Sequence, residues 1–207
     1  MRKSGAFLVR CHEDDYETLL EAKVEKLHGL LSEFWGTGRT IETFQSERMN
    51  YRMRANFSIW RDSPNDPDPR SLYYAMFEEE HPTIPLEVVD FPRGTKRMNS
   101  IMIQLLKYMQ QNPDANLHLR LMEVRIVTTL TDDAVIVLIY NRPLLQTWED
   151  EATKLSVHLA AKIIGRSRKV KKVIGGDELV EEILHVHGQP IKYYQTGRFY
   201  RKVILYN

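Results

Sequence analysis

The chain has 207 residues, 43% of them hydrophobic, so it is long enough to bury one good core or two small ones. Lys and Arg number 29 against 28 Asp and Glu, and this balance gives no general attraction to nucleic acids or membranes. The one cysteine, Cys11, excludes an internal disulfide and a thiolate-based zinc site, and no apolar run approaches the roughly 18 to 20 residues that span a bilayer.

Residues 1–15 are predicted to be a leader segment. Ala6–Val9 is too short for the apolar centre of a secretory signal. Arg2, Lys3 and Arg10 would suit a short organelle-targeting leader, but the acidic residues 13–15 are uncommon in such leaders. The compartment is therefore predicted to be cytoplasmic or mitochondrial.

The first helix is predicted over Tyr16–Phe34, where apolar residues recur at helical spacing between charges. Asp15 is its expected N-cap, and Gly36 and Gly38 are expected to end it.

A strand with strict alternation follows at residues 51–60. One face is expected to point to the core and carries Tyr51, Met53, Ala55, Phe57 and Ile59. The opposite face carries Arg52, Arg54, Asn56 and Ser58. These arginines could pair with Glu87 or Glu123 on a neighbouring strand, or they could form a local anion-binding surface.

The remaining elements are read from periodicity and turn residues. Residues 61–70 are expected to form a surface loop, followed by strands at 72–77 and 86–89, a helix over 98–109 and a hairpin of 121–130 with 134–140. A third helix is expected at 146–162, and then short strands and glycine turns around a small helix. The pattern predicts an α+β fold with a largely antiparallel sheet packed against three amphipathic helices.

The stretch "GRSRKVKK", Gly165–Lys172, has five basic residues in eight and no acidic one. Such a cluster in a nearly neutral chain indicates a local anion-binding surface, because arginine forks bind phosphate oxygens at two points. The alternative is a solvated, charged loop.

The sequence offers few arrangements of residues that would suit catalysis. Cys11 and His12 are neighbours in sequence, but adjacent residues on an extended segment seldom face each other. His185 and His187 have no third metal ligand at useful spacing. Ile174–Gly176 is a turn and lacks the spacing of a phosphate-binding loop.

Four stretches in this order and at these separations resemble one family: "NYRMRANFSIW", "VVDFP", "VTTLTDDAVIVLIY" and "IIGRSRKVKK…DELVEEIL". They are similar to the first half of the tRNA uracil-5-methyltransferases of the TrmA type, over about Tyr16–Tyr194. The resemblance implies binding to the T-arm of tRNA, extrusion of a uridine, attack on its C6 by a cysteine thiolate, and methylation of C5 from S-adenosylmethionine.

In that family a C-terminal Rossmann-like domain holds the cofactor and the nucleophile, and the resemblance implies that it is absent from this chain. Cys11 does not match the nucleophile. The family's linking segment reaches the target base with a glutamine; here Phe199 is retained and Arg201 stands at the glutamine position. Met122 and Asn141 stand where bacterial members carry a loop-stacking aromatic residue and a histidine. These departures imply a changed or relaxed RNA target.

The resemblance therefore divides the chain into a leader (1–15), an RNA-recognition region (16–195) and a divergent tail (196–207). It implies no catalytic residue, no metal and no cofactor in this chain, with S-adenosylmethionine bound only by full-length members. The expected RNA-binding residues are Arg52, Arg54, Asn56, Arg142, Arg166, Arg168, Lys169, Lys171 and Lys172.

The expected partner is a tRNA T-arm or a structured rRNA or tRNA-like element, with no membrane. Three interpretations stay open. The chain could be a catalytically incompetent RNA-binding half, either a truncated gene product or a subunit that needs a catalytic partner. It could also be a non-catalytic RNA-binding or ribonucleoprotein assembly protein derived from this family, or a fragment of an active methyltransferase.

Overall fold

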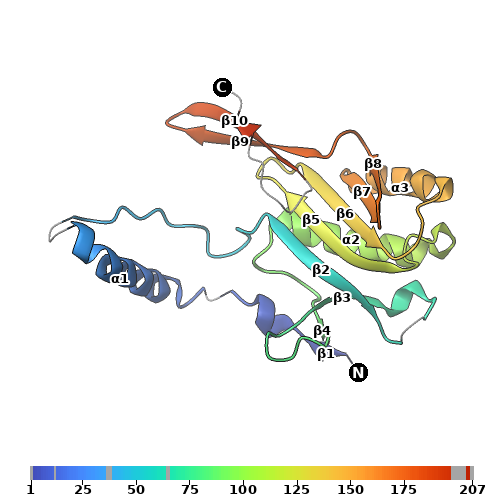
Figure 1. The fold of residues 1–207 in the computed structure, drawn as a ribbon, viewed down its shortest axis with the longest axis horizontal. Coiled ribbons are helices and arrows are strands. Elements are labelled where there is room, and N and C mark those ends of the chain that lie inside the picture. The colour runs from blue at the N-terminus through green and yellow to red at the C-terminus, as the bar shows by residue number, and fades with distance from the viewer. Residues whose placement is uncertain (1, 12, 36–38, 64–65, 197–203, 206–207) are drawn as a thin grey trace.

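The computed structural model describes residues 2–11, 13–35, 39–63, 66–196 and 204–205, and its main feature is a mixed eight-stranded sheet (Figure 1). The strand order is β1-β4-β3-β2-β5-β6-β7-β8, antiparallel except for the pairs β1–β4 and β6–β7. The strands are β1 Lys3–Ser4, β2 Arg54–Arg61, β3 Leu72–Met76, β4 Leu86–Glu87, β5 Leu121–Thr128, β6 Ala134–Tyr140, β7 Lys162–Ser167 and β8 Val170–Ile174.

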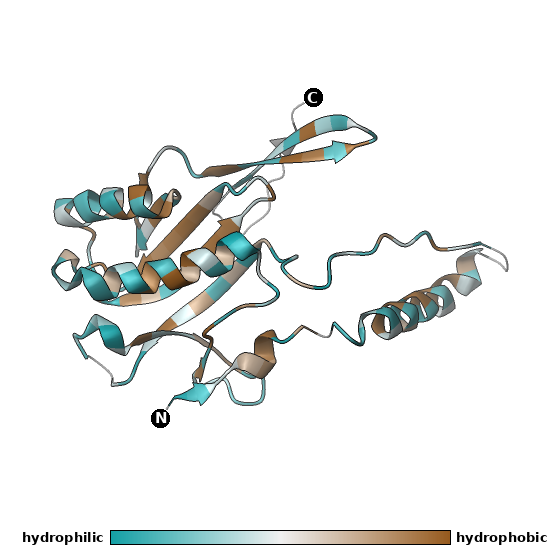
Figure 2. Ribbon diagram, turned by 180° about the vertical axis from the view of Figure 1, so that it is seen from behind, coloured by the Kyte–Doolittle hydropathy of each residue, from teal (hydrophilic) through white to brown (hydrophobic). Residues whose placement is uncertain are grey.

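Two helices, α2 (Lys96–Gln111) and α3 (Gln146–Leu159), cover one face of this sheet, as Figure 2 shows. Thr95 caps α2 by accepting a hydrogen bond from the Met98 amide, and α2 ends at Gln111, just before Pro113. The core lies between these helices and the sheet. It contains Met98, Ile101, Met102, Leu105 and Met109 from α2, and Trp148, Ala152, Leu155 and Leu159 from α3.

The predicted β5–β6 hairpin and the helices α2 and α3 are confirmed, but the prediction that three helices pack on the sheet is wrong for α1, Tyr16–Trp35. None of the side chains of α1 is buried, and α1 lies apart from the sheet (Figure 1). Its contacts come from the segment after it: Ser46 donates its amide hydrogen to the Tyr16 hydroxyl, and Arg48 pairs with Glu17. Because α2 and α3 already cover one face of the sheet, the core beneath them is filled without α1.

The expected small helix near the C-terminal end is also wrong. Instead, β9 (Leu179–Val186) forms a long hairpin with β10 (Gln189–Thr196), and β10 also pairs with β11 (Ile204–Leu205). His187 and Gly188 adopt positive φ in the turn. Val180 and Glu182 alternate with more exposed neighbours, and this period of two is the period of a strand.

The first residues contribute to the body of the fold. β1 pairs with β4, and Val9, in a short 3₁₀ helix (Ala6–Val9), is buried in the core. Arg2 binds Asp62 and Glu87, each at 2.7 Å. Over the described residues no helix is long and apolar enough to cross a lipid bilayer.

Candidate nucleic-acid interface

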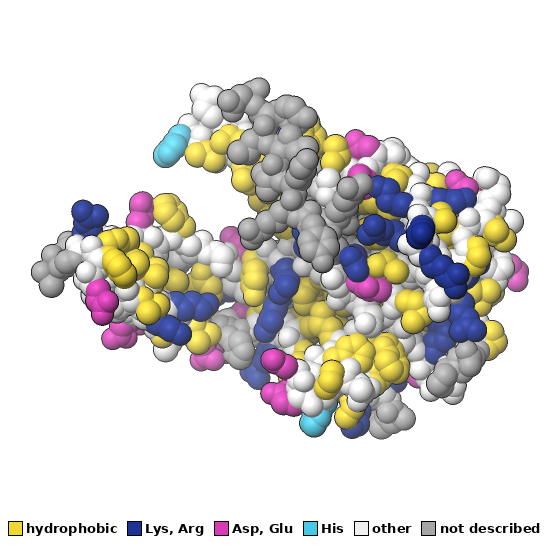
Figure 3. Space-filling model, in the orientation of Figure 1, with side chains coloured by type: hydrophobic (Ala, Val, Ile, Leu, Met, Phe, Trp, Pro, Cys, Tyr) yellow, Lys and Arg dark blue, Asp and Glu magenta, His cyan; other side chains and the backbone are white. Residues whose placement is uncertain are grey.

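The sheet face opposite α2 and α3, called here the open face, carries the candidate site. Register across the sheet aligns Ser58 (β2), Glu123 (β5), Ile139 (β6), Arg166 (β7) and Lys171 (β8) in one row. The adjacent row is Asn56, Arg125, Val137, Ile164 and Val173, of which Val137 and Ile164 are buried in a second apolar cluster with Val180 of β9. Figure 3 shows Lys and Arg side chains gathered over the β6–β8 part of this face.

The two arginines of the predicted strand have different surroundings. β2 begins at Arg54, and Arg54 donates from Nη2 to Oε1 of Gln195 on β10 at 3.3 Å. Arg52 precedes the strand, and its Nε donates to the Arg54 carbonyl oxygen at 3.1 Å. Tyr51 was expected in the core but is exposed, because the regular alternation starts only at Arg54.

The carboxylates proposed as partners for these arginines bind other cations. Glu87 pairs with Arg2, and Glu123 pairs with Arg125 on its own strand at 2.6 Å. Arg125 is therefore a further basic group on the open face that sequence analysis missed. The alternation of β5 could have indicated it.

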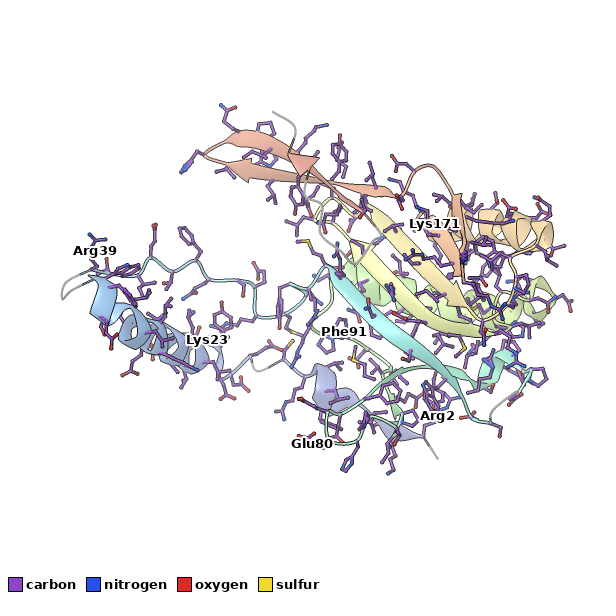
Figure 4. All side chains as sticks on the ribbon, viewed as in Figure 1. Arg2, Lys23, Arg39, Glu80, Phe91 and Lys171 are labelled. Atoms are coloured by element: carbon purple, nitrogen blue, oxygen red, sulfur yellow. The ribbon has the colours of Figure 1, made fainter. Side chains whose placement is uncertain are left out.

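The segment Gly165–Lys172 lies in a tight β7–β8 hairpin, and its five basic residues do not share one face of the sheet. Arg166 and Lys171 lie on the open face, where Lys171, labelled in Figure 4, pairs with Glu178 at 2.6 Å. Arg168 and Lys169 are exposed in the turn, with Arg168 at φ 48°. Lys172 points to the helix side and pairs with Glu149 of α3.

Arg142 also lies away from the open face. It follows β6, its guanidinium lies 5.4 Å from the Tyr140 ring centroid, and its Nη2 donates to the Asn116 carbonyl oxygen at 2.7 Å. With Trp148 and Glu151 it lines a separate hollow beside α3. The structure thus groups Arg54, Asn56, Arg166 and Lys171 with the adjacent turn, and leaves Arg142 and Lys172 elsewhere.

A large hollow was also missed by sequence analysis. It has a volume of about 830 Å³ and lies where β2 and β3 approach the residues before β5, with Trp60, Tyr73, Phe77 and Met122 among its walls. Trp60 continues the polar row of β2 two residues beyond Ser58. The alternation of β2 could therefore have indicated that Trp60 lies on the same face as Ser58.

Little in the described residues suits catalysis. Cys11 is half-buried, and burial raises the pKa of its thiol, which disfavours the thiolate. His185 is exposed on β9, and no cluster of three or more His, Cys, Asp or Glu side chains among the described residues could hold a metal ion. His12, Phe199 and Arg201 lie outside the described residues.

The carboxyl end of β6, which pairs in parallel with β7, does not suit S-adenosylmethionine. In α/β sheets such ligands bind beyond the carboxyl end of a parallel strand. Here the segment after β6 has no glycine, and the buried side chains of Leu144 and Trp148 fill the space against Gly165.

An α+β region with one helix-covered sheet face and a second, partly covered and locally basic face is thus a candidate nucleic-acid-binding module. The sequence profile of the tRNA (uracil-5-)-methyltransferase family matches residues 15–202, and the chain belongs to this family.

The relatives found by sequence comparison include tRNA/tmRNA (uracil-C(5))-methyltransferases of Pseudomonas aeruginosa (strain LESB58), 37% identical over 180 residues, and Acinetobacter baylyi, 38% identical over 183 residues. A third, from Pseudomonas fluorescens (strain Pf0-1), is 38% identical over 180 residues. Each match covers 87% of this chain but only 47% or 48% of the relative. The chain thus spans about half the length of these relatives.

Proposed function

We propose that this region binds RNA, and tRNA in particular, through the open face, as the RNA-holding part of a uracil-5-methyltransferase. The observation that carries the proposal is the gathering of basic groups on one sheet face of a chain whose net charge is only +1. The matching relatives are named for action on tRNA and tmRNA, which supports RNA as the ligand.

Phosphate binding is the expected role of the basic groups. Arg166, Arg168, Lys169 and Lys171 lie on neighbouring positions of one hairpin, and Arg54 lies across the sheet on β2. Contacts to phosphates fix the position of an RNA but carry little sequence information, so base identity must be read by other groups. A folded element such as the T-arm suits a broad face of this kind. S-adenosylmethionine and the transfer step belong, in this proposal, to parts of the family protein other than the described residues.

The test compares two variants in which the same amount of positive charge is removed. The open-face variant changes Arg166, Arg168, Lys169 and Lys171 to Ser. The control changes four exposed lysines on the helices to Ser: Lys23 and Lys26 of α1, Lys107 of α2 and Lys154 of α3. Figure 4 shows Lys23 far from Lys171. tRNA affinity is measured by filter retention between about 50 and 200 mM salt, where the affinity of phosphate-binding proteins falls by orders of magnitude.

The open-face variant should bind weakly to all RNA sequences, and its salt slope should fall by about one unit for each phosphate that it no longer neutralises. The control should bind nearly like the parent. Equally weakened binding in both variants would mean that only net charge matters, and unchanged binding in the open-face variant would refute the proposed face.

A further inference from the structure

A separate hollow lies where α1 meets the body of the fold, and it is called here the α1 hollow. Tyr16 and Lys23 line it from α1, and Tyr51 and Arg93 line it from the body. The chain after α1 runs back beside the helix (Figure 1) and closes a third side with residues 44–48. Its volume of about 360 Å³ lies within the range of small-ligand sites. None of the open-face residues named above lines it, so the phosphate-binding role of that face does not account for it.

Every charged side chain that lines the α1 hollow is basic: Arg10, Lys23, Arg48 and Arg93. Arg48 is neutralised by an ion pair with Glu17. Within the described residues, the side chains of Arg10 and Lys23 have no hydrogen-bond or ion-pair partner, and the Arg93 guanidinium donates only to a backbone carbonyl oxygen. Three positive charges without a carboxylate therefore surround one hollow, and their mutual repulsion is relieved when an anion binds between them.

Arg93 is held in a position that suits a phosphate. Its Nε and Nη2 donate to the Arg10 carbonyl oxygen at 3.0 and 2.8 Å, which fixes the plane of the guanidinium and leaves Nη1 for a ligand. Burial raises the pKa of the Cys11 thiol in the same wall, and the positive charge of Arg93 opposes this rise, so the guanidinium lies beside Cys11. A fixed guanidinium binds phosphate oxygens at two points, and a lysine adds charge.

The rest of the lining is apolar or aromatic. Phe44 is 84% exposed and Tyr51 is 45% exposed, while Tyr16 is held in place because its hydroxyl accepts the Ser46 amide hydrogen at 2.9 Å. A bare anion would leave these surfaces in contact with water, whereas a nucleotide joins its phosphate to a planar group that covers them. A nucleotide therefore matches both parts of the lining.

We infer that the α1 hollow binds the phosphate group of a nucleotide through Arg10, Lys23 and Arg93. The nucleotide is either free or part of an RNA chain, and only the second case rests on the proposed function. Lys23, labelled in Figure 4, comes from α1, whereas Arg93 comes from the segment before α2, so the bound phosphate ties the helix to the body of the fold. Lys23 is also one of the four lysines of the control variant above; in the RNA case that control loses one contact, fewer than the open-face variant.

The test uses Cys11, because it is the one cysteine of the chain and it lines the α1 hollow. The rate of its alkylation by iodoacetamide is followed by mass spectrometry without ligand and with AMP, inorganic phosphate, a glutamate peptide or a tRNA transcript. The Kd of AMP comes from equilibrium dialysis. At about 100 times that Kd, AMP should slow alkylation by up to about 100-fold, because only the empty hollow admits the reagent.

Substitutions connect the protection of Cys11 to the cations. Arg10→Ser combined with Lys23→Ser breaks no contact within the described residues, and this double variant should bind the nucleotide at least about 10-fold more weakly, as expected when charge-assisted hydrogen bonds are lost. Lys107→Ser combined with Lys154→Ser, on α2 and α3, removes the same charge and should bind as the parent does. In each variant the rate with ligand is divided by the rate without it, and urea unfolding checks that the variant is folded.

The outcomes separate the two sources of the phosphate. Slowing by AMP that the double variant loses supports a free nucleotide, and slowing by tRNA alone, also lost in the double variant, supports an RNA phosphate. If neither slows alkylation in the parent, or if the double variant responds as the parent does, the α1 hollow is not a phosphate site, while RNA binding by the open face stands. A glutamate peptide as effective as AMP would overturn the assignment to phosphate. A parent that binds AMP but no tRNA at about 50 mM salt refutes the proposed function and supports the free-nucleotide site.

Discussion

At the scale of single residues, Gly165 is essential to the contact between β7 and α3. A Cβ at this position would lie 2.3 Å from Cη2 of Trp148 and 2.8 Å from Cδ1 of Leu144, both in the core. We expect Gly165→Ala to destabilise the fold by about 1–3 kcal/mol, because a filled core must shift to admit the methyl group. Urea unfolding followed by tryptophan fluorescence measures the loss of stability.

Gly29→Ala is the matched control, because nothing lies within 4 Å of the added Cβ on α1. Alanine is the better helix former by about 1 kcal/mol, so this variant should be as stable as the parent or slightly more so. Equal stability of both variants would show that β7 can move away from Trp148 without cost.

Single residues also show how much of the candidate site could be predicted from the sequence. Alternation placed Arg54 and Asn56 correctly on the face opposite Phe57. The cluster Gly165–Lys172 was treated as one surface, although neighbours on a strand point to opposite faces, and so Lys172 lies against α3 while Lys171 lies on the open face. The cluster was therefore wrongly treated as one surface, because the β7–β8 hairpin was not predicted.

At the scale of elements, α1 should behave differently from α2. Most of the stability of a helix in a protein comes from packing of its apolar face, and α1 has no buried side chain. In hydrogen exchange of dilute protein, we expect peptides from residues 16–35 to exchange at least about 100-fold faster than those from residues 96–111. Leu105→Ala should speed exchange in α2 and leave α1 unchanged, because Leu105 is fully buried.

Equal protection of α1 and α2 in the parent would show instead that α1 packs against something in solution. A dilution series would identify that partner as a second copy of the chain, because protection would then fall as the protein is diluted.

The elements that sequence predicted well are those with a local signal. α2, α3 and the β5–β6 hairpin each carry their own periodicity and turn residues. β1 was missed because it has two residues and pairs with β4, which lies more than eighty positions away, as in Lys3↔Leu86. The position of α1 was missed because an amphipathic pattern shows that a face is apolar but does not name what covers it.

At the scale of the whole molecule, nearly balanced charge conceals an uneven distribution. Acidic groups neutralise particular cations, as Glu149 does for Lys172 on the helix side, whereas Arg168 and Lys169 remain exposed in the β7–β8 turn. A net charge of +1 therefore limits long-range attraction without preventing a local RNA-binding surface.

The last prediction concerns catalysis by the 207-residue chain itself. Incubated with unmodified tRNA and labelled S-adenosylmethionine, it should transfer no label, because the carboxyl end of β6 does not suit the cofactor and burial disfavours the Cys11 thiolate. Cys11→Ser should bind RNA as the parent does. The Pseudomonas aeruginosa relative, assayed on the same tRNA, is the positive control for the substrate. Label transfer by the chain above a no-protein blank, abolished by Cys11→Ser, would instead make Cys11 a nucleophile and overturn the division of roles proposed above.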